Sequence, residues 1–219
     1  MHIREIVLGA ADESALKAVS QFYGDTLGLP VDHAQAGEIA FRVGDSRLVF
    51  VSGAASPRYH FAFNIPENQL EAARGWMTQF VPLIPGDDGS PVLHFPAWNA
   101  HSIYFYDPLG NVGELIARHG LPTASDAPFG AASLLNISEI GIPSPEVLAD
   151  AARWSERVDE SFYLGNSSEN FTAIGDEHGL LIVVSVGREW YPRSGVPAHD
   201  RPLSVIVDGL HGNPLDVMA

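Results

Sequence analysis

The chain has 219 residues, of which 46% are hydrophobic and 18% are charged, which suits one large globular domain or two small ones. It contains no cysteine, so disulfides, thiolate metal ligands and a cysteine nucleophile are excluded. The formal net charge of −15 argues against binding to nucleic acid or to an anionic membrane surface. Solubility is the simplest reason for so acidic a surface.

The sequence shows neither a signal peptide nor a segment that could span a membrane. The opening residues, MHIREIVLGA, lack the basic region and apolar core of a signal peptide. The longest apolar run, LLIVVSV at residues 180–186, is far too short to span a bilayer. We therefore expect a cytoplasmic protein.

The first part of the chain predicts a strand, a helix and three further strands. Alternating apolar residues indicate a strand over residues 3–9. Apolar residues at helical spacing follow over residues 12–26. Strand-like stretches come next at residues 31–34, 39–44 and 47–53, and a Gly-Asp-Ser turn joins the last two. This is one βαβββ unit.

The same order of elements then starts again. A strand is predicted over residues 59–66 and a helix over residues 67–80. Further strands are predicted at residues 93–95, 102–106 and 113–117. The stretch DPLG at residues 107–110 suits a type I turn, with proline second and glycine fourth. The second unit therefore repeats the first.

A third repeat follows a segment rich in proline, alanine and serine. That segment, residues 121–133, reads as a linker. After it, ISEIGIP echoes the IREIVLG that opens the chain, and a helix and a strand pair follow up to residue 187. Residues 202–210 resemble the start of a fourth unit, and HGNPLDVMA reads as a tail. We count three complete units and a stub.

Consecutive units are expected to pair, because sequential elements usually lie beside each other. Residues 1–120 would then form a complete two-unit module, and residues 134–219 a truncated second module. The truncated module would cover the first one or form a dimer.

Three stretches carry a resemblance to a known superfamily. They are FYGDTLGLPV at residues 22–31, YHFAFNIP at residues 59–66 and IYFYDPLGNVGEL at residues 103–115. In this order they resemble the vicinal oxygen chelate superfamily, which includes glyoxalase I, fosfomycin- and bleomycin-resistance proteins and extradiol dioxygenases. The resemblance implies an α/β (α+β) fold in which repeated βαβββ units form a cupped, mainly antiparallel sheet.

The resemblance also implies a metal site. Such folds take metal ligands from the first strand of each unit and from the last strand of a pair, which here gives His60, Glu114 and Glu5. Near-equal intervals separate the three positions, as a repeat requires. Glu114 inside a buried strand would be costly unless a metal, an arginine or a shifted pKa compensates it. An imidazole with carboxylates fits zinc, manganese, iron(II) or nickel.

The third ligand depends on which units pair. Glu139 occupies in the third unit the place that Glu5 has in the first. If the chain swapped and the third unit paired with the second, Glu139 would complete the site. Sequential pairing predicts Glu5. The position matching His60 in the stub is near Leu203, so no metal site is expected within the second half.

Residues 92–114 also resemble the extradiol dioxygenase signature. In that resemblance, Tyr104 and His94 would bind substrate oxygen or move protons. His101 is expected on the strand face opposite to Tyr104. One histidine with two carboxylates departs from the usual 2-His-1-carboxylate site of iron(II) oxygenases.

Three functions remain open from sequence. The favoured one is a divalent-metal-dependent lyase, isomerase or ring-cleaving dioxygenase that acts on a small molecule with adjacent oxygens. The alternative is a metal-free small-molecule binding or drug-resistance protein that uses the same cup. A scaffold without a ligand is the third. The expected partner is a small-molecule substrate, with a possible homodimer and with neither nucleic acid nor membrane.

Overall fold

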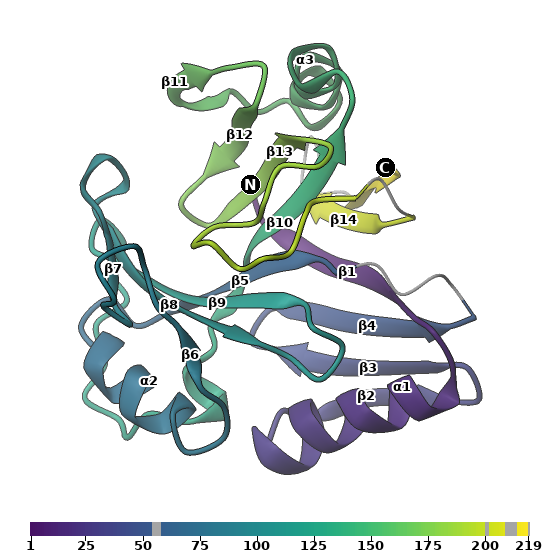
Figure 1. The fold of residues 1–219 in the computed structure, drawn as a ribbon, viewed down its shortest axis with the longest axis vertical. Coiled ribbons are helices and arrows are strands. Elements are labelled where there is room, and N and C mark those ends of the chain that lie inside the picture. Colours follow the sequence, from purple (N-terminus) through teal and green to yellow (C-terminus); the bar gives the residue numbers. More distant parts are fainter. Residues whose placement is uncertain (54–57, 200–201, 209–213, 219) are drawn as a thin grey trace.

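The computed structural model describes residues 1–53, 58–199, 202–208 and 214–218 (Figure 1). Its strands form one open, mostly antiparallel sheet, whose main path runs β2-β3-β4-β1-β10-β5-β9-β8-β6. The expected α/β class with repeated βαβββ units is confirmed.

The first unit follows the predicted order of elements. It contains β1 (Ile3–Ala10), α1 (Glu13–Val19), β2 (Val31–Gln35), β3 (Glu38–Val43) and β4 (Ser46–Ser52). The helix begins where the Asp12 carboxylate accepts a hydrogen bond from the backbone N–H of Ala15. It continues as a π-helix over Ser20–Thr26, which buries the aromatic rings of Phe22 and Tyr23.

The second and third units repeat this order with small variations. The second unit contains β5 (His60–Ile65), α2 (Leu70–Met77), β6 (Leu83–Ile84), β7 (Leu93–Phe95), β8 (Ala100–Tyr106) and β9 (Val112–Arg118). The third contains β10 (Asn136–Ser144), α3 (Val147–Val158), β11 (Phe162–Ser167), β12 (Phe171–Asp176) and β13 (Gly179–Ser185). In all three units the first strand pairs in parallel with the last, as β1–β4, β5–β9 and β10–β13.

The units do not pair in sequence order. Strand β10 of the third unit runs antiparallel to β5 of the second, and β14 (Ser204–Asp208) runs antiparallel to β1. Strands β1 and β10 meet through the single register pair Ile3–Ile137. The second and third units therefore form one cup, here called the site cup. The prediction that the first two units form the cup within residues 1–120 is wrong.

A hairpin at the end of the chain explains why the swap is stable. The segment expected to be a tail contains β15 (Pro214–Met218), which pairs antiparallel with β14. This hairpin lies against β1 and gives the first unit its partner, so the unit's edge is not left open. The linker over residues 121–133 carries the chain from β9 to β10, and both strands lie beside β5.

The first and third units meet at a tight junction. Gly44 has a φ of 52°, and a Cβ there would lie 1.7 Å from the carbonyl oxygen of Leu135, so glycine is required. Beside it, the Ser46 hydroxyl donates to the Ile3 carbonyl at 2.6 Å and accepts from the Ile137 N–H at 3.0 Å. These contacts fix β1 against β10.

Alternation along the strands separates a core face from a site face. On β5, Phe61, Phe63 and Ile65 join the main hydrophobic core, which also takes in buried residues of α2 and α3. His60 and Ala62 point to the other face. The three helices lie at the periphery of the sheet (Figure 1), and this leaves the other face of the site cup free to line a cavity.

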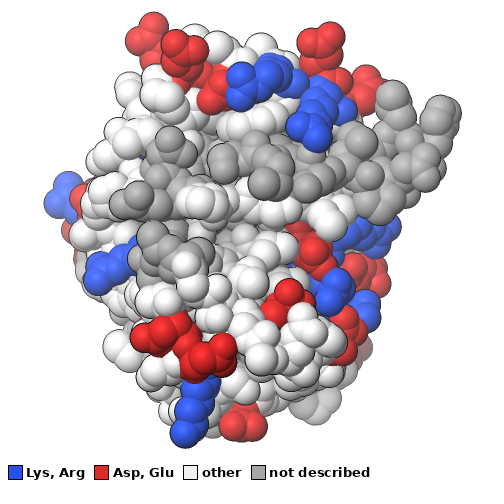
Figure 2. Space-filling model, turned by 90° about the vertical axis from the view of Figure 1, so that its right-hand side faces the viewer, with Lys and Arg blue, Asp and Glu red and all other residues white. Residues whose placement is uncertain are grey.

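Charged side chains of both signs share the surface. On the face in Figure 2, acidic and basic groups lie next to one another. Ion pairs such as Arg4–Asp208 at 2.6 Å and Arg47–Asp32 at 2.8 Å account for such mixing. In the described part of the chain, no helix has both the length and the apolar character needed to cross a membrane.

Candidate metal centre

His60 opens strand β5 with its ring facing the site cup. Its side chain is almost entirely buried, and its Nδ1 lies 3.1 Å from the carbonyl oxygen of Val112 on the neighbouring strand β9. Because a carbonyl can only accept, Nδ1 carries the proton and Nε2 has a free lone pair. Such a backbone hydrogen bond orients the ring of a metal-binding histidine.

Burial keeps this imidazole neutral. It lowers the pKa of His60 to about 4, and the positive charge of Arg188 adds to the shift, while the hydrogen bond to Val112 opposes it. The neutral form is the one that binds metals. His60 is therefore ready to act as a ligand over the whole neutral pH range.

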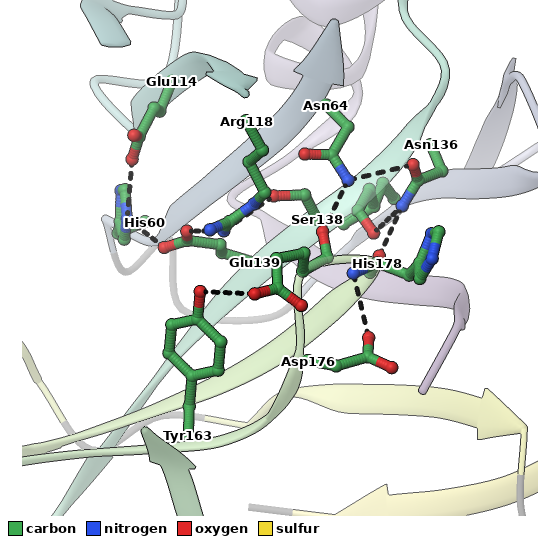
Figure 3. A network of polar contacts seen from close by, with 12 residues as sticks. His60, Asn64, Glu114, Arg118, Asn136, Ser138, Glu139, Tyr163, Asp176 and His178 are labelled. Atoms are coloured by element: carbon green, nitrogen blue, oxygen red, sulfur yellow. Dashed lines mark hydrogen bonds and ion pairs between the residues drawn. The ribbon is translucent and has the colours of Figure 1, made fainter. Parts of the chain in front are cut away.

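Two glutamates face His60 from neighbouring strands (Figure 3). Its Nε2 lies 3.6 Å from Oε2 of Glu114 on β9 and 4.0 Å from Oε2 of Glu139 on β10. One ligand atom from each of the three residues lies within 4.8 Å of the others. Ligand atoms that share an ion at bond lengths near 2.1 Å stand roughly 3.0 to 3.4 Å apart, so a small contraction would close the group around an ion.

Both carboxyls are buried and their charges repel each other. Burial and the negative charge of Glu139 raise the pKa of Glu114 to about 8, against the opposing effect of the hydroxyls of Ser102 and Tyr104. Burial also raises the pKa of Glu139, and Arg118 opposes that shift through an ion pair at 2.5 Å. Near neutral pH the pair therefore retains a proton that a cation would displace.

The donor set fits a divalent ion. One neutral imidazole nitrogen and two carboxylates, all buried, are ligands that zinc, manganese, iron(II) and nickel accept. Arg118 is almost fully buried, and Figure 3 shows it beyond Glu139, on the far side from His60. Its charge offsets one carboxylate and holds the Glu139 side chain in place.

The raised pKa of Glu114 predicts a pH-dependent effect of Glu114→Gln on the metal-free protein. The pKa of about 8 in the folded state exceeds the ordinary 4.5. The folded chain therefore binds more protons between these values, and its stability falls as pH rises through that window. Glutamine removes this term, so the stability of the variant relative to the parent should rise by about 3 to 4 kcal/mol between pH 5 and pH 8.

Urea unfolding of both proteins in chelator, near pH 5 and near pH 8, measures this difference. The depressed pKa of His60 acts in the opposite direction between about 4 and 6.5, but it is common to both proteins and cancels. A variant that gains no stability between the two pH values would contradict the assignment of a high pKa to Glu114.

A cavity of about 280 Å³ opens directly on the three candidate ligands. Half of the residues that line it are aromatic, and they are Phe95, Trp98, Tyr104, Phe171, Trp190 and Tyr191. Its volume is near the lower end for ligand pockets, which suits a small and largely planar molecule.

Residues 187–198, here called the capping segment, close one side of the cavity. Trp190 is 2% exposed, and its ring packs on Gly141, where a Cβ would lie 2.4 Å from the ring. Hydrogen bonds between Gly187 and Ala198 at 2.7 Å and between Trp190 and Val196 at 2.9 Å brace the segment. The wall beside His60 is therefore a folded structure.

Glu5 lies outside this group, so the prediction that it stands beside His60 and Glu114 is wrong. Its carboxylate is paired with Arg47 at 2.5 Å, on the first unit. Glu139 is opposite Ala62, two residues after His60, and Glu5 is opposite Ile206, two residues after Ser204. The swap thus gives Glu139 the place expected for Glu5, and it puts Ser204 rather than Leu203 at the position equivalent to His60.

Of the two residues expected to handle protons, Tyr104 lines the cavity and His94 does not. Burial and the nearby Glu114 and Glu139 raise the pKa of Tyr104 well above its usual value, so its phenol is neutral. His94 is exposed and stacks on His101 with ring centroids 4.3 Å apart. Since Phe95 lines the cavity, alternation along β7 turns His94 to the other face, and its proposed role is not supported.

Several residues of the site were not singled out from sequence. Arg118, Arg188 and Trp190 belong to it, yet only Arg118 had a usable signal, because a charged residue ends the otherwise apolar strand β9. Arg188 and Trp190 lie in the irregular capping segment, which no repeat pattern places in space.

Comparison with known proteins supports the fold. No protein-family model matches the chain, and no curated protein matches it significantly. Among solved structures, a candidate dioxygenase from Bacillus subtilis shares the fold with a TM-score of 0.58 and 15% identity, over 84% of this chain and 63% of its own. The resemblance to the glyoxalase, bleomycin-resistance and dioxygenase proteins is thus confirmed at the level of the fold.

Shorter matches cover about half of the chain. A lactoylglutathione lyase from Agrobacterium tumefaciens is 22% identical, with a TM-score of 0.43 over 52% of this chain and 90% of its own. A manganese-bound fosfomycin resistance protein, FosX, from Listeria monocytogenes is 19% identical, with a TM-score of 0.41 over 53% of this chain and 89% of its own.

Proposed function

We propose that the chain is a divalent-metal-dependent enzyme that acts on a small molecule with two adjacent oxygens, as a lyase, isomerase or ring-cleaving dioxygenase. The observation that carries this proposal is the buried group of His60, Glu114 and Glu139, which opens on a cavity. A bound ion would serve as a Lewis acid for negative charge that develops on a substrate oxygen.

The residues around the group have separate roles in this proposal. Tyr104 has a neutral phenol near Glu114, so it can donate a hydrogen bond to a substrate oxygen. Trp190 and the neighbouring aromatic rings exclude water and hold a flat substrate against the ligands. Arg118 keeps Glu139 oriented toward His60 through their ion pair.

The donor set also bears on the type of reaction. One imidazole with two carboxylates is richer in oxygen than the 2-His-1-carboxylate site of iron(II) oxygenases. Oxygen-rich sites suit manganese, and Mn²⁺ is therefore a suitable probe ion for this site. Within the proposal, lyase and isomerase chemistry fit this set better than oxygen activation does.

Metal content tests the proposal. Protein stripped with chelator and reloaded with Mn²⁺ should hold one ion per chain, and His60→Ala should reduce the affinity by about 100-fold or more because it removes a direct ligand. The matched control is His94→Ala, since His94 is exposed on the opposite face of the sheet. Equal metal content in the parent and in His60→Ala would reject the site.

A metal-free binding or resistance protein is the second candidate, and the aromatic wall favours it. Rings on several sides of the cavity could trap an aromatic guest without any ion. Parent protein that takes up no Mn²⁺ but still binds aromatic compounds would establish this alternative.

A further inference from the structure

Arg188 contributes a positive charge to the wall of the cavity. It lies two residues before Trp190 in the capping segment and lines the same cavity as His60 and Glu139. The side chain is thus close enough to meet a molecule that occupies the cavity.

The guanidinium of Arg188 has no anionic partner among the described residues. It packs over the ring of Phe171, with Cζ 5.3 Å from the ring centroid. Seven other arginines of the described chain pair with carboxylates, namely Arg4, Arg42, Arg47, Arg74, Arg118, Arg153 and Arg193. A partly buried cation without a partner is unfavourable, and a carboxylate ligand would compensate it through paired hydrogen bonds.

The base of the Arg188 side chain is fixed in place. The Arg188 carbonyl accepts a hydrogen bond from the Ala198 N–H at 2.7 Å, and the N–H of Gly187 donates to the Ala198 carbonyl, also at 2.7 Å. With the backbone held in this way and the guanidinium resting on Phe171, little conformational entropy is lost when an anion binds.

We propose that Arg188 binds the carboxylate of an aromatic carboxylate substrate whose adjacent oxygens face His60, Glu114 and Glu139. The inference deepens the proposed function and rests on it for the placement of the oxygens. The aromatic wall accounts for the ring, and the volume of about 280 Å³ limits the substrate to one or two rings. Arg188 then determines specificity by rejecting the uncharged analogue.

Calorimetric titration in the absence of oxygen with 3,4-dihydroxybenzoate and with its uncharged amide, 3,4-dihydroxybenzamide, tests this assignment. The dihydroxybenzoate carries a ring, two adjacent hydroxyls and a separate carboxylate. Arg188→Gln should weaken dihydroxybenzoate binding by roughly 10- to 100-fold and leave dihydroxybenzamide binding unchanged, while Arg188→Lys should lose less. Arg193→Gln is the matched control, because Arg193 lies on the same segment but is exposed and paired with Asp87.

Two outcomes would overturn the inference. One is dihydroxybenzoate binding that is equal in the parent and in Arg188→Gln. The other is parent protein that binds dihydroxybenzoate no better than dihydroxybenzamide, or does not bind it. Thermal unfolding of each variant checks that it is folded. The titrations are run with metal-free and with Mn²⁺-treated protein. Arg188-dependent binding in a chain that takes up no Mn²⁺ would support this inference and reject the proposed function.

Discussion

Glu139→Gln is expected to reduce Mn²⁺ affinity by about 100-fold or more, whereas Glu5→Gln leaves it unchanged. The two glutamates hold equivalent positions in two repeats, but only Glu139 lies near His60, with 4.0 Å between Oε2 and Nε2. Glu5 instead pairs with Arg47 at 2.5 Å. The glutamine variants keep the volume of each side chain, so the comparison isolates the charge and the ligand atom.

Equilibrium titration with Mn²⁺, followed by its electron paramagnetic resonance signal, measures both variants under one condition. Circular dichroism confirms that each is folded. A large loss with Glu5→Gln and none with Glu139→Gln would show that the first and second units form the site, and that the observed swap does not exist in solution.

Arg118→Met is expected to produce the largest loss of stability among the site variants. The guanidinium is 1% exposed and is the ion-pair partner of the buried Glu139. Removing one partner of a buried pair leaves an uncompensated charge, at a cost of roughly 3 kcal/mol. Part of the Arg118 side chain also contacts Trp98, with Cζ 5.6 Å from its ring centroid, and methionine retains some of that packing.

The loss should depend on pH with a definite sign. Burial already raises the pKa of Glu139, and removing Arg118 raises it further. A carboxyl pKa that is higher in the folded state stabilises the fold at pH values below the pKa of the unfolded state. That stabilisation is lost as pH rises through the pKa of the folded state. Arg118→Met should therefore lose more stability near pH 8 than near pH 5, and the double variant Arg118→Met, Glu139→Gln should recover most of the loss.

Urea unfolding of the metal-free proteins at both pH values completes the cycle. An additive double variant would mean that the two side chains do not interact, which would contradict the ion pair. Equal losses at both pH values would show that the destabilisation comes from packing and not from the charge of Glu139.

The repeat and most of its elements could be predicted from the sequence because they depend on local patterns. Strand alternation and the turn at residues 107–110 identified β5, β8 and β9, and with them the facing of His60, Tyr104 and Glu114. Parity along β8 also placed His101 on the face opposite to Tyr104. These are properties of period and register, which short windows of sequence determine.

The third ligand could not be chosen by the same reasoning. Glu5 and Glu139 occupy equivalent positions in two repeats, so the local sequence supports both of them equally well as ligands. The choice depends on whether β5 pairs with β1 or with β10. The short hairpin β14–β15 pairs with β1, and β5 pairs with β10 instead. The repeat pattern predicted β14, within residues 202–210, but not β15, which pairs antiparallel with β14 and has no counterpart in a complete unit.

One side of the cavity wall was also beyond prediction, because an irregular segment builds it. Trp190 and Arg188 come from the capping segment, whose course depends on contacts with distant residues such as Gly141. His94 was predicted wrongly for another reason. The resemblance to a motif placed it in the site, although alternation along β7 turns it to the face opposite to Phe95. A sequence motif identifies neighbours along the chain, but a site is defined by neighbours in space.

The central claim is that His60, Glu114 and Glu139 together bind one divalent ion. An anomalous difference map from crystals soaked in Mn²⁺, with data collected near the manganese absorption edge, tests it directly. The expected result is one strong peak at about 2.0 to 2.3 Å from Nε2 of His60 and from an oxygen of each glutamate. No peak at this position, or a peak held only by the surface histidines His94, His101 and His119, would contradict it.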